Sequence, residues 1–153
     1  MAVLEIRKAG DQILKQPCVP VAKIGKKTTE LLDNMAQTMY FADGVGLAAP
    51  QVGILSRLIV VDVGEGLIEM INPSIVEREG SENGKEGCLS IPGIYGEVER
   101  SFRVVVDGFD RKGKKIRIAG EGFLARALQH EIDHLDGILF IEKAQVLHQE
   151  RAQ

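Results

Sequence analysis

Residues 130–134 read His-Glu-Ile-Asp-His, and this segment constrains the chain more than any other part of the sequence. Two histidines four positions apart lie on one face of an α-helix, about one turn from each other. Their imidazoles can bind one divalent metal, and the intervening Glu131 then lies beside that metal as a base for water. The chain has only three histidines, so two of them in this motif favour a metal-dependent hydrolase.

The alternative is an amphipathic helix that carries two histidines by chance. Gly120 and Gly122 interrupt the chain before this segment, and Gly137 offers a C-terminal stop. Apolar residues at helical spacing lie between them: Leu124, Leu128, Ile132 and Leu135. The segment therefore predicts a helix of about three to four turns, buried on most sides. A buried histidine pair without a metal or a carboxylate partner would be costly, which favours the metal.

Length, charge and cysteine content exclude several classes of protein. A chain of 153 residues predicts one domain spanning residues 1–153. The net charge of -3 argues against nucleic acid as the main partner. No apolar run approaches the ~20 residues that a membrane helix needs, and residues 1–14 do not resemble a signal peptide. Two cysteines, Cys18 and Cys88, form no secreted-type disulfide framework, so we expect a reducing compartment, most simply the cytoplasm.

The remaining pattern predicts several short strands and a second helix. Thr28 and Thr29 are expected to cap a helix that ends at Asp43-Gly44. The expected strands are 57–63, 67–72 and 75–78, followed by a hairpin of 102–109 and 115–118. Residues 1–27, 44–53 and 80–96 are expected to be mainly irregular. This order predicts an α+β fold, with antiparallel sheets around a central metal-binding HExxH helix and a second, N-terminal helix.

A catalytic metal needs three protein ligands and one open position, so a third ligand must come from elsewhere in the chain. Cys88 is the best candidate, because it follows a glycine in Glu-Gly-Cys-Leu-Ser and a thiolate suits a borderline divalent metal. Cys88 can also be read as a small buried hydrophobe or as a nucleophile paired with a histidine. His148, Glu142 and Glu150 are weaker candidates, since their surroundings carry no motif.

A run of small residues, Gly-Val-Gly-Leu-Ala-Ala-Pro-Gln, occupies positions 44–51. It lacks the Gly-Lys-Ser/Thr of a phosphate-binding loop. An extended peptide could approach this segment closely and pair with its backbone. Gln51 offers a neutral amide donor that would stabilise a developing oxyanion. The alternative is a plain turn after a helix.

Three segments in this order resemble the peptide deformylases: 44–51, Glu-Gly-Cys-Leu-Ser at 86–90 and His-Glu-Ile-Asp-His at 130–134. The resemblance implies hydrolysis of the N-formyl group from the formyl-methionine of newly synthesised polypeptides, with release of formate. It implies that Cys88, His130 and His134 hold the metal, typically Fe²⁺, with Zn²⁺, Ni²⁺ or Co²⁺ as alternatives. It also implies a bacterial-type cytoplasmic setting, with nascent peptides met at the ribosome and no nucleic-acid or membrane partner.

The resemblance also implies a role for each site residue. Glu131 would act as general base on metal-bound water and then return the proton to the leaving amine. Gln51 and the backbone N–H of Leu89 would stabilise the tetrahedral oxyanion. The substrate would lie against residues of the small-residue run and of the metal helix: Gly44, Val45, Gly46, Phe123 and Ala127.

Further charged residues are expected around the site. We expect Asp133 to pair with Arg100 behind the metal and Glu86 to support a ligand, although each could equally be a surface charge. Arg126 would either rim the methionine pocket or lie exposed. Three other classes are distinguishable by experiment: a general HExxH peptidase with another third ligand, a cysteine amidohydrolase, and a non-catalytic metal-binding module.

Overall fold

The structure is a computed structural model, and it describes residues 2–149. Its elements are, in chain order, η1 (Gln12–Lys15), α1 (Lys26–Phe41), β1 (Gly46–Ala48), η2 (Ala49–Val52), β2 (Leu58–Val61), β3 (Ile68–Glu79), β4 (Glu82–Cys88), β5 (Ile91–Arg100), β6 (Arg103–Phe109), β7 (Lys115–Glu121), α2 (Gly122–Leu135), η3 (Phe140–Glu142) and β8 (Ala144–Gln149). Neither of the described α-helices is long and apolar enough to cross a membrane.

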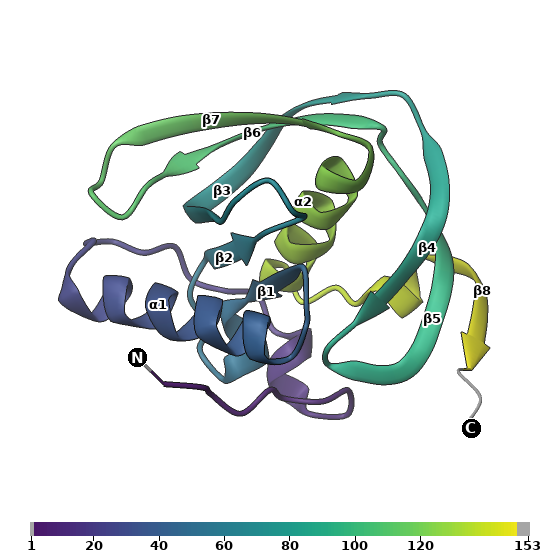
Figure 1. Cartoon of the computed structure of the whole chain (residues 1–153), viewed down its shortest axis with the longest axis horizontal. Coiled ribbons are helices and arrows are strands. Elements are labelled where there is room, and N and C mark those ends of the chain that lie inside the picture. Colours follow the sequence, from purple (N-terminus) through teal and green to yellow (C-terminus); the bar gives the residue numbers. More distant parts are fainter. Residues whose placement is uncertain (1, 150–153) are drawn as a thin grey trace.

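The strands form two antiparallel sheets. The larger sheet has the order β1-β2-β3-β6-β7, and the smaller one has the order β4-β5-β8. Helix α2 lies between them in the middle of the molecule, and α1 runs along one side below β1 and β2 (Figure 1). The predicted α+β fold, with antiparallel sheets around the HExxH helix and a second N-terminal helix, is confirmed.

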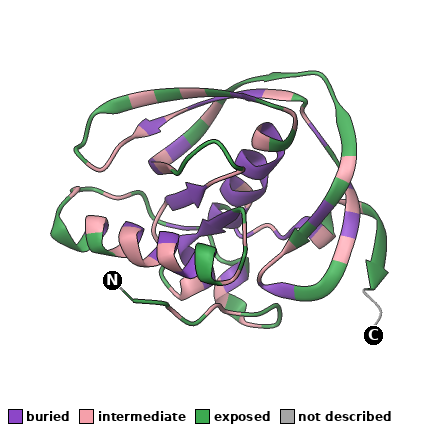
Figure 2. Cartoon of the chain, in the orientation of Figure 1, coloured by how far each residue is buried: buried purple, intermediate pink, exposed green. Residues whose placement is uncertain are grey.

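Helix α2 is almost completely enclosed (Figure 2). Leu128 and Leu135 have no exposed surface, and they belong to a core cluster with Val104 and Val106 of β6. Burying a leucine side chain contributes about 1.5–3 kcal/mol. Apolar packing against the larger sheet therefore fixes the position of the helix that carries both site histidines.

Helix α1 begins at least three residues earlier than expected. Lys26 is its first residue and Gly25 is its N-cap, so the prediction that Thr28 and Thr29 cap the helix is wrong. Thr28 lies inside the first turn because the apolar face, and not the local capping preference, sets the start of this helix. Leu32 and Met35 from this face are fully buried against the first two strands of the larger sheet.

The two strands expected at 67–72 and 75–78 are one continuous strand, β3. Pro73 does not end the strand, because the pairing with β6 shifts register between Ile71 and Ser74. A bulge of this kind accommodates a residue that cannot donate to the ladder. Asn72 adopts a positive φ of 52° at the same point, and its side chain bonds to both the N–H and the C=O of Val21.

Two regions expected to be irregular contain regular structure. Residues 44–53 hold β1 and η2, and residues 80–96 hold β4 and most of β5. Cross-strand pairing overrides the low strand propensity of glycine here. Gly96 shows why a glycine is needed, since a Cβ there would lie 2.9 Å from the carbonyl oxygen of Val146 in β8. The hairpin expected after residue 101 is confirmed as β6 and β7, whereas β8 was not expected.

Candidate metal centre and active site

Three side chains that can ligate a metal converge where the smaller sheet meets α2. Cys88 is the last residue of β4, and His130 and His134 lie one turn apart on α2. Their potential ligand atoms all lie within 4.8 Å of one another. The Cys88 Sγ lies 3.3 Å from the His134 Nε2. This is the set of residues that the sequence motifs singled out.

The chemistry of the donors fits a borderline divalent transition metal. One thiol and two imidazoles are the ligand types that such ions prefer. His130 bonds through Nδ1 to Glu86 Oε1 at 2.8 Å, which leaves its Nε2 for an ion. A carboxylate on the far ring nitrogen is a common partner of a metal-binding histidine. The His134 Nδ1 is buried and has no hydrogen-bond partner within residues 2–149.

Their surroundings shift the pKa values of the two buried histidines in opposite directions. Burial lowers the pKa of His130, but its hydrogen bonds to Cys88 and Glu86 outweigh burial, and the net pKa lies well above the usual value. Burial and the neighbouring His130 charge hold the pKa of His134 well below the usual value.

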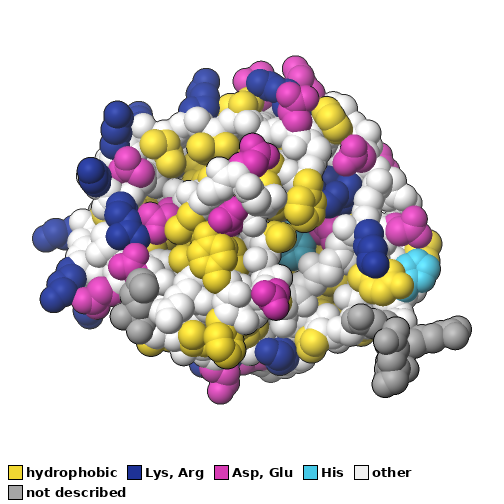
Figure 3. Space-filling model, in the orientation of Figure 1, with side chains coloured by type: hydrophobic (Ala, Val, Ile, Leu, Met, Phe, Trp, Pro, Cys, Tyr) yellow, Lys and Arg dark blue, Asp and Glu magenta, His cyan; other side chains and the backbone are white. Residues whose placement is uncertain are grey.

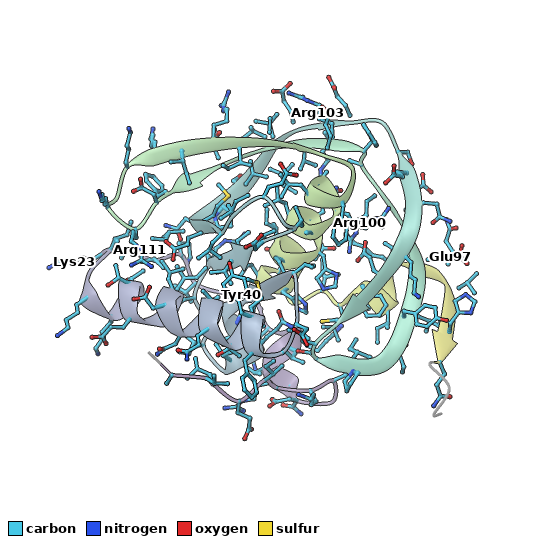
Figure 4. The ribbon with its side chains drawn as sticks, in the orientation of Figure 1. Lys23, Tyr40, Glu97, Arg100, Arg103 and Arg111 are labelled. Atoms are coloured by element: carbon cyan, nitrogen blue, oxygen red, sulfur yellow. The ribbon has the colours of Figure 1, made fainter. Side chains whose placement is uncertain are left out.

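Glu86 is the centre of a buried ionic network. Its carboxylate accepts from Arg100 Nε at 2.7 Å and from Arg100 Nη2 at 2.9 Å. Burial raises the pKa of Glu86, but the hydrogen bonds from Arg100 and His130 outweigh it and lower the pKa to about 2. Arg100 Nη1 also donates to Asp133 Oδ2 at 2.6 Å, so the expected Arg100–Asp133 pair is present. Figure 4 shows Arg100 between α2 and β4.

Glu131 follows His130 on α2, and its carboxylate packs against Gly46 of β1. Its side chain is buried, and its Oε1 has no hydrogen-bond partner among the described residues. A Cβ on Gly46 would lie 2.9 Å from the Glu131 Cδ, so only glycine leaves room for this carboxylate. Burial raises the pKa of Glu131 to about 7, with a smaller opposing effect of His130. A carboxylate with such a pKa can both accept and return a proton near neutral pH.

Gln51 is buried beside the cluster at the end of η2. Its Oε1 accepts from the backbone N–H of Ala48 at 3.0 Å, which orients the amide. Its Nε2 donates to Ser90 Oγ at 3.1 Å and lies 3.5 Å from Cys88 Sγ. The amide donor therefore points at the candidate metal site. Leu89 follows Cys88 directly in the turn between β4 and β5, and its side chain covers Gly44.

A cavity of about 530 Å³ opens at this cluster, within the range of about 300–1,000 Å³ typical of small-ligand sites. Every residue expected to contact substrate lines it: Gly44, Val45, Gly46, Phe123 and Ala127. Phe123 is 55% exposed and lies at the mouth, whereas Ala127 is buried. Figure 3 shows a histidine side chain recessed between hydrophobic side chains on this face.

Of the alternative third ligands, the two that the structure describes, His148 and Glu142, make other contacts. His148 stacks on Tyr95 in the smaller sheet, with ring centroids 5.3 Å apart. Glu142 pairs with Lys15 at 2.6 Å. Glu150 lies outside the described residues. Cys18 is buried elsewhere in the core, where burial raises the pKa of its thiol to about 11.

Two residues near the site have roles that the sequence did not predict. Ser90 is fully buried and accepts the Gln51 bond; its place in the Glu-Gly-Cys-Leu-Ser segment was a signal that could have been followed. Arg126 lines the cavity, as expected, but its side chain is only 6% exposed and pairs with Glu86, so the alternative of an exposed surface charge is wrong. Helical spacing predicts that Arg126 lies one turn before His130, but it does not predict the contact of its side chain with β4.

A paired-histidine helix, a thiol donor from a neighbouring strand and a buried carboxylate of raised pKa define the class of protein as a metal-dependent hydrolase. Comparison with known proteins shows to which family of metal-dependent hydrolases the chain is similar. Residues 3–150 match the polypeptide deformylase family. The chain is 61% identical over 145 residues to the peptide deformylase of Halothermothrix orenii, covering 94% of both chains. It is 62% identical over 144 residues to that of Pelotomaculum thermopropionicum, covering 94% of this chain and 93% of the relative.

Solved structures agree with this match. The peptide deformylase of Thermotoga maritima superposes with a TM-score of 0.92 at 43% identity, covering 94% of this chain and 99% of that one. That of Synechococcus elongatus, in complex with actinonin, gives 0.91 at 45% identity, covering 94% and 79%. The chain belongs to the polypeptide deformylase family. It is an enzyme that removes the formyl group from N-terminal formyl-methionine.

Proposed function

We propose that residues 1–153 form one catalytic domain in which Cys88, His130 and His134 hold a single divalent metal. The observation that carries this proposal is the convergence of their ligand atoms within 4.8 Å. Bonded to Glu86 through Nδ1, His130 has its Nε2 available for the ion. When bound, the ion supplies a Lewis acid and lowers the pKa of water.

Fe²⁺ is the proposed native ion, with Zn²⁺, Ni²⁺ and Co²⁺ as alternatives that the same ligands accept. Family resemblance supports iron. The distinction is testable by metal analysis of protein purified without oxygen. Iron as the main metal with the highest activity supports the proposal, and zinc with equal or higher activity contradicts it.

Glu131 is proposed to carry the proton. It takes a proton from the attacking water and later delivers it to the nitrogen of the leaving amine. A pKa of about 7 suits both halves of this transfer. The absence of a partner for its Oε1 among the described residues leaves that oxygen free to contact water.

Gln51 and the Leu89 backbone N–H are proposed to stabilise the oxygen of the formyl group as it becomes negative. The Gln51 Nε2 supports this role, because its contact with Cys88 Sγ is long at 3.5 Å. The Nε2 carries two hydrogens, so one can donate to the substrate while the other keeps the hydrogen bond to Ser90 Oγ.

The cavity is proposed to seat the methionine end of an extended peptide. Val45, Phe123 and Ala127 supply apolar surface for the side chain, and Gly44 and Gly46 allow the peptide backbone to approach. The tight packing at Gly46, where even a Cβ would collide with Glu131, would exclude acyl groups larger than formyl. The expected substrates are nascent chains in a bacterial-type cytoplasm, met at the ribosome.

The proposed ligand set is tested by metal content and formate release from formyl-Met-Ala-Ser. We expect wild type to bind one metal ion per chain and to lose activity with chelator. Cys88→Ala should bind the metal weakly and release little formate. His148→Ala, on the exposed strand β8, serves as the matched control and should behave as wild type.

Two outcomes would contradict the proposal. Activity that persists in chelator would favour a cysteine nucleophile in place of a metal. Cys88→Ala could instead keep full metal content and activity while His148→Ala loses both. That result would make His148 of β8 the third ligand in place of Cys88.

A further inference from the structure

The side chain of Arg126 is unusual because a full positive charge is buried beside the cavity. It is only 6% exposed, and buried arginines are retained mainly where they are paired. It projects from α2, one turn before His130, toward the smaller sheet. Neither the sequence motifs nor the proposed chemistry accounts for this residue.

Arg126 makes hydrogen bonds to four acceptors in the smaller sheet, the longest of them from Nη1 to the Gly84 carbonyl at 3.5 Å. Its Nη1 donates to Glu86 Oε2 at 2.8 Å and to the Val98 carbonyl at 2.8 Å. Its Nη2 donates to the Glu82 carbonyl at 2.8 Å. The guanidinium thus bridges α2 to both β4 and β5.

Gly84 in β4 leaves the space that this bridge occupies. A Cβ at that position would lie 2.8 Å from the Arg126 Nη2 and 2.9 Å from its Cζ. The backbone of Gly84 has an ordinary φ, so strain does not explain the glycine. The close approach of the guanidinium does.

The bridge acts on both sides of the candidate metal site. Glu86 accepts four hydrogen bonds, two from Arg100 and one each from Arg126 and His130. The oxygen that does not face His130 is shared by both arginines, which fixes the plane of the carboxylate. Cys88 follows Glu86 by two residues on the same strand, so the same contact also fixes β4 relative to α2.

We propose that Arg126 is a positioning residue, which sets the orientation of His130 through Glu86 and the distance of Cys88 from the two histidines. This inference rests on the proposed metal ligands. The guanidinium makes no hydrogen bond to Cys88, His130 or His134 among the described residues, and its fork reaches four acceptors that an ammonium could not reach together. Its effect is therefore on the affinity for metal, through the geometry of the ligands.

The test compares the Zn²⁺ affinity of folded variants, measured by competition with a chromophoric chelator. Arg126→Met keeps the aliphatic stem and removes the guanidinium. We expect its Zn²⁺ affinity to fall about 10–100-fold, as for other outer partners of metal ligands, and Arg126→Lys to be intermediate. Arg117→Met removes an exposed arginine paired with Asp107, and it should bind Zn²⁺ as wild type does.

Gly84→Ala tests the same bridge independently. It keeps the charge of Arg126, but the added Cβ would push the guanidinium out of its place. We expect weaker Zn²⁺ binding here too. If Arg126→Met does not fold, Gly84→Ala decides: reduced affinity supports the proposal and wild-type affinity overturns it. The melting temperature of each variant is recorded alongside, since a purely stabilising role would lower it without changing the affinity of the folded protein.

Zn²⁺ affinity of folded Arg126→Met within about twofold of wild type would overturn the proposal, since outer-partner losses are normally larger. An equal loss in Arg117→Met would overturn it as well. Failure of the ligand assignment looks different: wild type itself would then bind no Zn²⁺ at the site. The two proposals can therefore fail separately.

Discussion

At the scale of single residues, Gly46 controls the position of the proposed base. Gly46→Ala would place a Cβ 2.9 Å from both Cγ and Cδ of Glu131, and the carboxylate would have to move. Misplacement by about 1 Å can cost up to about 100-fold in rate, so we expect kcat for formate release to fall by about 10–100-fold. Metal content should stay at the wild-type level. A variant with wild-type kcat would show that this contact does not position Glu131.

The ionisation of Glu86 makes stability depend on pH. Its folded pKa of about 2 lies below the usual 4.5, so the unfolded chain binds more protons between these values. The stabilisation is complete above pH 4.5 and is lost as the pH falls toward 2. For a shift of this size we expect a loss of about 3 kcal/mol.

Urea unfolding of the metal-free protein across this pH interval measures the effect. Glu86→Gln removes the titrating group, so the variant should lose less stability over the same interval than wild type. Parallel pH profiles for the two proteins would contradict the depressed pKa.

The sequence predicted the residues of the site better than their contacts. The ligand types and the spacing of His130 and His134 follow from helix geometry, and the structure brings Cys88 to them. The burial of Arg126 could not be predicted, because a helical pattern does not say which strand lies opposite each face. Pairing across 40 positions, as between Arg126 and Glu86, is a property of the tertiary fold.

At the scale of elements, Gly137 fixes the end of α2, the helix that carries His130 and His134. It has a φ of +75°, and a Cβ there would lie 2.6 Å from the Lys15 carbonyl oxygen. Gly137→Ala combines left-handed strain with overpacking against backbone, so we expect a loss of about 2–4 kcal/mol. Urea unfolding measures this loss.

Gly113→Ala in the β6–β7 turn is the matched control for this prediction. Gly113 has a similar φ of +82°, but its Cβ would meet no atom closer than 4.0 Å. We expect a smaller loss, of about 1 kcal/mol, from strain alone. Equal losses in the two variants would show that the approach of Lys15 contributes nothing.

Element prediction succeeded where periodicity was strong and failed where glycine and proline were frequent. The metal helix and the β6–β7 hairpin carry clear apolar patterns, and both were found. The strands β4 and β5 contain several glycines, and their pairing is decided by partners rather than by local preference. Strand β3 passes through Pro73 because a bulge there removes the need for its N–H, a solution that local sequence does not reveal.

At the scale of the whole molecule, the proposed metal joins the smaller sheet to α2. A ligand that binds only the folded state at 100 times its Kd adds about 2.7 kcal/mol to the free energy of unfolding. For a domain of this length that corresponds to about 5–11 °C in melting temperature. Chelation should lower the melting temperature of wild type by this amount and leave Cys88→Ala unchanged. An equal shift in both proteins would place the stabilising ion elsewhere.

The proposed reaction depends on Glu131, which would transfer the proton for hydrolysis of the formyl group at a metal held by Cys88, His130 and His134. The most direct measurement is formate release from formyl-Met-Ala-Ser by metal-loaded wild type and Glu131→Gln, with metal content determined on the same samples. We predict that the variant retains its metal and loses about 10²–10⁴-fold in kcat, the usual contribution of general acid–base catalysis. A metal-loaded variant as active as wild type would contradict the claim.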